Sequence, residues 1–99
     1  MKQITTILAI LVSFTMSAQL GVVIEGSNTG QRLTISSATN HGPIGNDAVD
    51  LSYSTSASND VGARGQYSFA AGWTVTASGM GSVAMGYNSD ATDAGSVAI

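Results

Sequence analysis

Hydrophobic and polar residues alternate along much of this chain after its first eighteen positions. In residues 48–55, Val49, Leu51 and Tyr53 alternate with small or polar neighbours. A period of two places successive side chains on opposite faces of an extended strand. No stretch after residue 18 has convincing helical periodicity, and glycine, serine and threonine are poor helix formers. The pattern therefore predicts an all-β protein.

Two segments precede this strand. Residues 19–36 predict a β-hairpin, because the β-branched run at 22–25 and the alternating run at 32–36 flank a turn-forming sequence. Residues 37–47 are rich in Gly, Asn and Asp and predict a loop. We therefore expect residues 19–50 to form an N-terminal β-rich segment with a loop.

From residue 65 onward the chain repeats itself every fourteen residues without a gap. Gly-Ser-Val-Ala stands at 81–84 and again at 95–98. A weaker copy at 51–64 keeps Ser54 and Ala63 in register. One strand of about five residues, a glycine turn at Gly72 or Gly86, a second short strand and another turn account for one repeat. The repeat predicts a parallel β-solenoid, or β-roll, over residues 51–99.

Small and larger residues alternate within each repeat. We expect the larger ones to line the interior of the roll and the small ones to form a bare outer face that another chain can approach closely. Association is expected because such a short coil buries little apolar area alone, and solenoids generally need at least three repeats. The predicted core residues are Phe69, Ala71, Val83, Met85, Val97 and Ile99, and the predicted chain–chain contacts are Ser68, Ala70, Gly72, Ser82, Ala84, Gly86, Ser96 and Ala98.

The aromatic residues Trp73 and Tyr87 occupy the same position in successive repeats. Stacked aromatic rings on a surface can hold a partner, and they can equally fill the seam between two chains. Both interpretations stay open from the sequence, and the seam is the one that we favour.

The first eighteen residues differ in sequence character from the rest of the chain. Lys2 precedes an apolar run from 4 to 14, and Met16-Ser17-Ala18 ends in a small residue. This order is typical of a secretory signal peptide, with cleavage expected after Ala18. The apolar run is shorter than the ~20 residues that a membrane-spanning helix needs, so we expect no span in the mature chain.

Composition excludes several classes of function. After residue 18, two arginines face six acidic residues, so the phosphate-neutralising patch of a nucleic-acid-binding protein is missing. The chain has no Cys, so disulfides cannot stabilise it outside the cell. We expect a secreted or bacterial cell-surface protein that carries no cofactor.

Three motifs invite a chemical interpretation, and each has a simpler one. Residues 79–84 fit G-x-G-x-x-A, yet no helix is predicted after them. His41 is the chain's one histidine and is expected in a solvated loop, because nothing marks a positioned nucleophile. Two acidic pairs lack the spacing of a calcium loop, and turn formation explains them better: Asp47 with Asp50, and Asp90 with Asp93. We predict no catalytic, cofactor or metal site.

The repeat resembles the head repeat of trimeric autotransporter adhesins, the YadA-like head. Its motif is roughly S-V-A-I-G followed by x-x-[S/A]-x-A. Ser96-Val97-Ala98-Ile99 matches the core, residues 82–86 nearly do, and residues 68–72 match more loosely. The resemblance covers residues 65–99, or 51–99 with the weaker copy. It implies a left-handed parallel β-roll, a homotrimer, and adhesion to host matrix or to other cells.

The chain departs from that family in two respects. It contains neither the coiled-coil stalk nor the C-terminal membrane barrel, and residues 19–64 lie outside the strong repeats. The repeat stops at Ile99 before its expected glycine, which indicates a fragment with further repeats beyond. We therefore expect a non-enzymatic adhesin head with an unidentified extracellular ligand. The alternative is the structural shaft of a secreted or tail-type fibre that ends in an endosialidase-type chaperone.

Overall fold

The computed structural model describes residues 20–99, and the predicted signal peptide lies outside the described residues. These residues form nine β-strands and one turn of 3-10 helix, with no α-helix among them. The elements are β1 (Leu20–Glu25), β2 (Asn28–Leu33), η1 (Ala38–Asn40), β3 (Val49–Tyr53), β4 (Gly62–Ala63), β5 (Phe69–Trp73), β6 (Thr76–Ala77), β7 (Val83–Tyr87), β8 (Asp90–Ala91) and β9 (Val97–Ala98).

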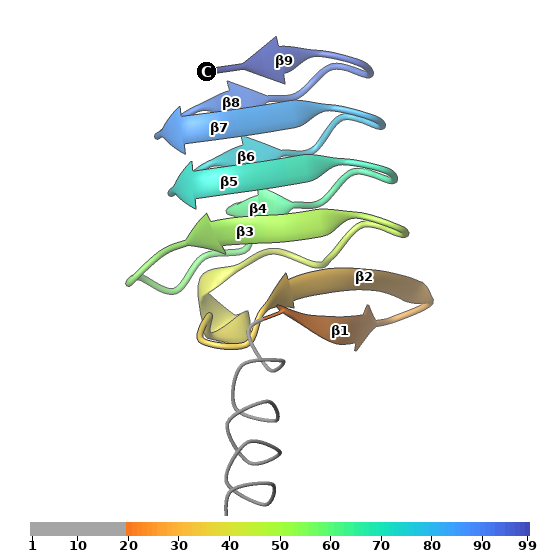
Figure 1. The fold of residues 1–99 in the computed structure, drawn as a ribbon, viewed down its shortest axis with the longest axis vertical. Coiled ribbons are helices and arrows are strands. Elements are labelled where there is room, and N and C mark those ends of the chain that lie inside the picture. Colours follow the sequence, from red (N-terminus) through yellow and green to blue (C-terminus); the bar gives the residue numbers. More distant parts are fainter. Residues whose placement is uncertain (1–19) are drawn as a thin grey trace, which may run out of the picture.

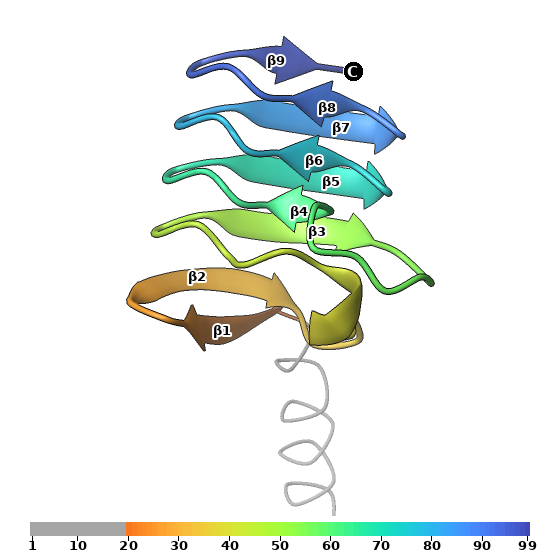
Figure 2. The ribbon, with the colours of Figure 1, turned by 180° about the vertical axis from the view of Figure 1, so that it is seen from behind.

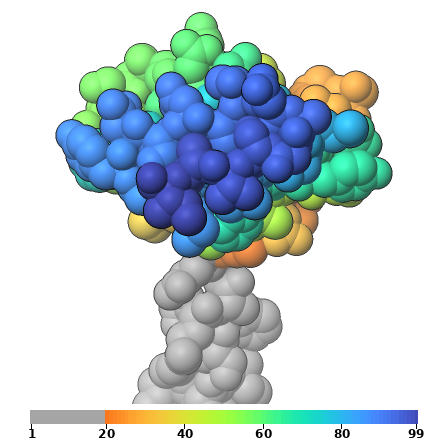
Figure 3. Space-filling model, turned by 90° about the horizontal axis from the view of Figure 1, so that it is seen from above, coloured from red at the N-terminus to blue at the C-terminus, as the bar shows by residue number. Residues whose placement is uncertain are grey.

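The strands build two sheets that face one another. The larger sheet, here called sheet A, has the order β1-β2-β3-β5-β7-β9, and the smaller sheet B has the order β4-β6-β8. The chain alternates between them from β3 onward, so each coil adds one strand to sheet A and a short strand to sheet B (Figures 1 and 2). Seen end-on, the C-terminal coils cover most of the earlier ones (Figure 3). The predicted all-β parallel solenoid is confirmed.

The predicted hairpin is present at the start of the roll. β1 and β2 pair antiparallel from Leu20↔Leu33 to Glu25↔Asn28, and the turn lies at residues 26–27. All the other strand pairs are parallel. The hairpin therefore closes one end of a stack whose remaining strands run in one direction.

The strand register shows a fourteen-residue coil only in the later part of the roll. Phe69 pairs with Val83, and Val83 pairs with Val97, at the predicted spacing. The earlier coils are longer, because Gln31 pairs with Val49 and Val49 pairs with Phe69, at spacings of eighteen and twenty residues. The extra residues of the second of these coils lie in the loop of residues 54–61 between β3 and β4.

This loop shifts the weak copy at 51–64 partly out of register. Ala63 pairs with Ala77, as the repeat predicts. Asp50 pairs with Ala70, however, so Ser54 is not the equivalent of Ser68. The repeat pattern alone could not place the loop, because a fourteen-residue alignment without gaps does not reveal an insertion.

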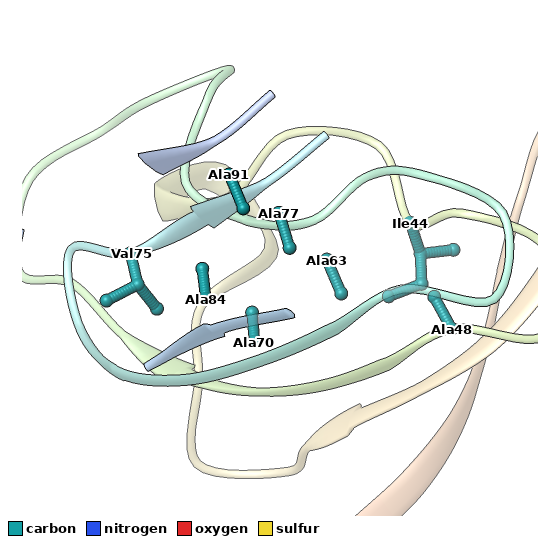
Figure 4. Close-up of a cluster of buried hydrophobic side chains, with 8 residues drawn as sticks. All are labelled: Ile44, Ala48, Ala63, Ala70, Val75, Ala77, Ala84 and Ala91. Atoms are coloured by element: carbon teal, nitrogen blue, oxygen red, sulfur yellow. The ribbon is translucent and has the colours of Figure 1, made fainter. Parts of the chain in front are cut away.

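The core between the two sheets consists mostly of alanine. Ala70 and Ala84 of sheet A lie beside Ala77 and Ala91 of sheet B, with Val75 at one end (Figure 4). Ile44, Ala48 and Ala63 extend the same cluster, and Ile44 and Val75 are its largest fully buried side chains. The interior of the roll is therefore narrow.

The predicted assignment of the two strand faces is wrong. Ser68, Ala70, Ser82 and Ala84 are buried inside the roll rather than offered to another chain. The reason is width: the sheets of so short a coil approach closely enough that alanine fills the space between them. The residues predicted to form the core point outward instead: Phe69, Ala71 and Val83 are partly exposed, and Met85, Val97 and Ile99 are exposed.

The other residues predicted to contact a second chain occupy the same alternate positions of their strands, as the strand register shows. Gly72 pairs with Gly86 and Ala84 with Ala98 in the parallel ladder. Gly72 has φ +131°, and a Cβ there would collide with the carbonyl oxygen of Gly86. Its glycine is required by contact between coils rather than between chains.

The repeated serine has a specific structural role. The hydroxyl groups of Ser68, Ser82 and Ser96 each donate a hydrogen bond of 2.7 Å to the carbonyl oxygen three residues earlier. Each bond closes one corner of a coil, and Ser68 and Ser82 are buried while they do so. A serine with this hydroxyl bond therefore stands directly before β5, β7 and β9.

Candidate functional site

The outward face of sheet A is apolar from β3 onward, and together with the apolar residues of the hairpin it is here called the apolar wall; Thr29 and Gln31 of β2 are polar residues on the same face. Strand register places its residues in columns along the roll, because directly paired residues share a face. One column runs through Val49, Phe69, Val83 and Val97. The wall comprises Leu20, Val22, Ile24, Leu33, Val49, Leu51, Tyr53, Phe69, Ala71, Trp73, Val83, Met85, Tyr87, Val97 and Ile99.

The opposite side of the roll is polar, and we call it the polar wall. Thr76 and Asp90 point outward from sheet B, while their neighbours Ala77 and Ala91 point inward. Of the charged residues in the sheet A strands, Arg32 and Asp50 are buried, and Glu25 is partly buried and paired with Arg32. The two walls therefore differ in chemistry although the same coils build both.

An aromatic column forms one margin of the apolar wall. Tyr53 pairs with Trp73, and Trp73 pairs with Tyr87. The Tyr53 and Trp73 rings have centroids 5.4 Å apart and planes tilted by 54°. Sequence analysis found Trp73 and Tyr87 but missed Tyr53, because the loop after β3 moves it out of the fourteen-residue spacing.

A buried polar cluster lies near the hairpin. Arg32 Nε is 3.3 Å from Asp50 Oδ2, and Arg32 Nη2 is 3.1 Å from Glu25 Oε1 and from the carbonyl oxygen of Gly42. Asp50 Oδ1 also accepts bonds from the backbone N–H and the hydroxyl of Ser52. Glu25 Oε1 accepts the N–H of Ile44 at 2.9 Å. The cluster joins the hairpin, the following loop and β3.

His41 belongs to this buried region rather than to a solvated loop, so the predicted exposure is wrong. Its Nδ1 lies 2.9 Å from the carbonyl oxygen of Ser37, and its Nε2 lies 3.3 Å from that of Ser52. The Ser52 hydroxyl donates to Asp50 instead of to the imidazole. This arrangement is no Ser–His–Asp relay, because the histidine contacts backbone oxygens and the serine is withdrawn from solvent.

Asp47 and Asp50 lie in different surroundings, and the glycine motif of residues 79–84 does not have the structure of a dinucleotide-binding site. Asp50 is fully buried, whereas Asp47 is exposed in a turn with φ +56°. Within residues 20–99, no group of three or more His, Asp or Glu side chains is arranged to hold a metal ion. Strand β7, rather than a helix, follows Gly79 and Gly81. These glycines therefore lie at a corner of the roll.

A shallow hollow interrupts the apolar wall between the hairpin and the first coils. It has a volume of about 230 Å³ and lies where β2 and β3 pair through only two residue pairs. Its lining mixes apolar and polar groups: Val22, Thr29, Gly30, Gln31, Asp47, Ala48 and Val49. The hollow is a depression in the apolar wall, and the residues that line it form no cluster of reactive side chains.

Within the described part of the chain, no helix has the length and apolar character to cross a membrane. Comparison with protein-family models, curated proteins and solved structures finds no match. The apolar wall and its aromatic margin are therefore the features from which a function must be argued.

Proposed function

We propose that this protein is a secreted, non-enzymatic adhesin head in which three copies pack through their apolar walls. The supporting observation is the contrast between the walls: one carries aliphatic columns without a charged side chain, and the other carries Thr76 and Asp90. Monomeric soluble proteins rarely expose large contiguous apolar patches, so a surface of this kind marks an interface.

The core supports the same proposal. Alanine side chains fill most of the interior, and each buries little apolar area. A small domain with so modest a core is marginally stable alone. Packing Val83, Met85 and their equivalents against another copy would bury the larger side chains that the roll itself cannot enclose.

The number of copies and the biological role rest on the resemblance of residues 65–99 to the YadA-like head repeat. The direction of the wall refines this resemblance: the larger residues of the motif, rather than the small ones, form the chain–chain contact. Three parallel rolls would present several copies of a weak surface contact, and their combined binding would be much stronger than that of one chain.

The test compares substitutions on the two walls of the full-length secreted protein. Val83→Glu should convert the trimer to monomer in analytical ultracentrifugation, because it places charges at the shared interface. Thr76→Glu on the polar wall is the matched control and should remain trimeric. A wild-type protein that sediments as a folded monomer contradicts the assembly.

Adhesion needs a separate measurement. The trimer should bind a layer of extracellular matrix or cells at least about tenfold more strongly than the Val83→Glu monomer, because linked contacts act together. A stable trimer that binds neither surface contradicts the adhesin role and favours the structural shaft of a fibre. Assembly and adhesion are thus tested independently.

A further inference from the structure

Three independent features meet at one margin of the roll, where β3, β5 and β7 end. The first is the aromatic column of Tyr53, Trp73 and Tyr87, which we call the aromatic edge. The exposed fractions of these residues are 38%, 40% and 77%. On β3 and β5, the neighbouring residues Leu51 and Phe69 are less exposed than the rings beside them. The aromatic edge therefore lies at the rim of the apolar wall and is open to solvent in the single chain.

The second feature is unusual backbone geometry beside two of the three rings. Thr74 has φ +50° and Asn88 has φ +52°, directly after Trp73 and Tyr87. The left-handed region is a genuine outlier for a β-branched residue such as threonine. The N–H of Thr74 donates to the carbonyl oxygen of Tyr53 at 2.9 Å, and Asn88 donates in the same way to Trp73. The corner thus defines the backbone directly after Trp73 and Tyr87 and ties it to the coil before.

The third feature is the loop of residues 54–61, which leaves the roll directly after Tyr53 (Figure 1). It is tied to the preceding coil by Asn40 Nδ2, which donates to the carbonyl oxygen of Ser54 at 2.8 Å. Its exposed residues include Thr55 and Ser56. Insertions into solenoid coils often border the binding face. Hydroxyl groups are therefore supplied beside the first ring of the column.

The chemistry of this edge selects a ligand class. Aromatic rings offer apolar faces and hydroxyl groups together, as amphipathic ligands require. The loop's one acidic residue, Asp60, is paired with Arg64 at 3.1 Å, so the loop presents no unbalanced charge. The rings recur at the strand spacing of about 4.8 Å along the roll. A matching ligand is neutral, bears hydroxyl groups, and repeats along its length.

We propose that the aromatic edge binds a neutral, extended polysaccharide. Its pyranose rings pack on Tyr53, Trp73 and Tyr87, and its hydroxyl groups bond to the polar groups of the corner and loop. This inference rests on the proposed function and names the class of surface molecule that the adhesin head holds.

Trp73 is the chain's one tryptophan, so its fluorescence reports directly on this edge. The full-length protein is titrated separately with cellohexaose, chitohexaose and maltohexaose. At least one hexasaccharide should change the Trp73 emission saturably, and the matching disaccharide should bind about tenfold more weakly, because it reaches fewer rings. No saturable change with any of the three overturns the proposal.

Two variants show whether the response comes from this edge. Tyr87→Ala should weaken hexasaccharide binding about tenfold, whereas Tyr87→Phe should retain most of it. Tyr67→Ala is the matched control: Tyr67 is also an exposed tyrosine, outside the aromatic column, and its loss should change nothing. Equal losses in Tyr87→Ala and Tyr67→Ala overturn the proposal.

Sedimentation of each variant separates this inference from the proposed assembly. Tyr87→Ala should remain trimeric, because its ring lies at the rim of the apolar wall. If it dissociates to monomer, the ring belongs to the seam between chains and the proposal is wrong. A trimer that adheres to protein matrix, with no response to the three hexasaccharides, keeps the proposed function and overturns the polysaccharide.

Discussion

Arg32 Nε lies 3.3 Å from Asp50 Oδ2, and both side chains are withdrawn from solvent inside the roll. The pair joins β2 to β3, the first parallel step of the stack, where the strands share only two residue pairs. Asp50 is further bonded to Ser52, and Arg32 to Glu25. Side-chain bonds therefore reinforce a step at which the strand ladder is short.

Asp50→Asn should destabilise the protein by about 3 kcal/mol, because it leaves a buried guanidinium with less compensating charge. Chemical denaturation monitored by circular dichroism measures the change. Asp60→Asn is the control, because Asp60 pairs with Arg64 at the surface and such pairs contribute little. Equal losses in both variants would show that the buried pair has no special role.

Ala84→Leu should destabilise the roll more than Val83→Leu. Ala84 is fully buried between the two sheets, where added atoms have no space, and overpacking costs about 1–3 kcal/mol or more. Val83 is partly exposed on the apolar wall and tolerates an extra methylene group. Thermal melts of the two variants decide the matter, and the inverse order would contradict the observed faces.

Ser82→Ala should cost about 1 kcal/mol, because the Gly79 carbonyl oxygen loses the hydroxyl that closes its corner. Ser78→Ala, at the end of a sheet B strand, is the comparison and should be nearly neutral. The free energies of unfolding from urea titrations provide the test. A neutral Ser82→Ala would show that the corner holds without its side-chain bond.

Two glycines with positive φ allow the cost of backbone strain to be distinguished from the cost of a steric collision. Gly81 has φ +67° with open space where a Cβ would stand, so Gly81→Ala should cost about 1 kcal/mol through backbone strain. Gly72→Ala should cost clearly more, because its Cβ would also strike the next coil. Equal losses of melting temperature would mean that neighbouring coils separate easily.

The strand pattern and the repeat spacing predicted much of this fold. Alternation at Val49, Leu51 and Tyr53 located β3, and the columns of Phe69, Val83 and Val97 follow from the fourteen-residue period. Inward and outward faces were not predictable from alternation, because a period of two leaves the choice of face open. The choice depends on the distance between the two sheets, which residue size along one strand does not reveal.

The buried cluster and the full aromatic edge escaped sequence analysis for a related reason. Glu25, Arg32 and Asp50 come from three strands whose pairing depends on coils of unequal length. Tyr53 stands twenty residues before Trp73 rather than fourteen. A gap-free repeat identifies residues that recur at one interval, and it overlooks partners brought together across an insertion.

From β5 onward each coil meets its neighbour through the same hydrogen-bonding row, the same inward alanine and the same corner serine. An in-frame duplication of one coil would thus extend the rod by about 4.8 Å while creating no junction that the molecule does not already contain. The length of the roll and the number of residues in its aromatic column can therefore increase by duplication of a coil. The hairpin end cannot be copied in this way, because its buried polar cluster joins the hairpin to one particular coil.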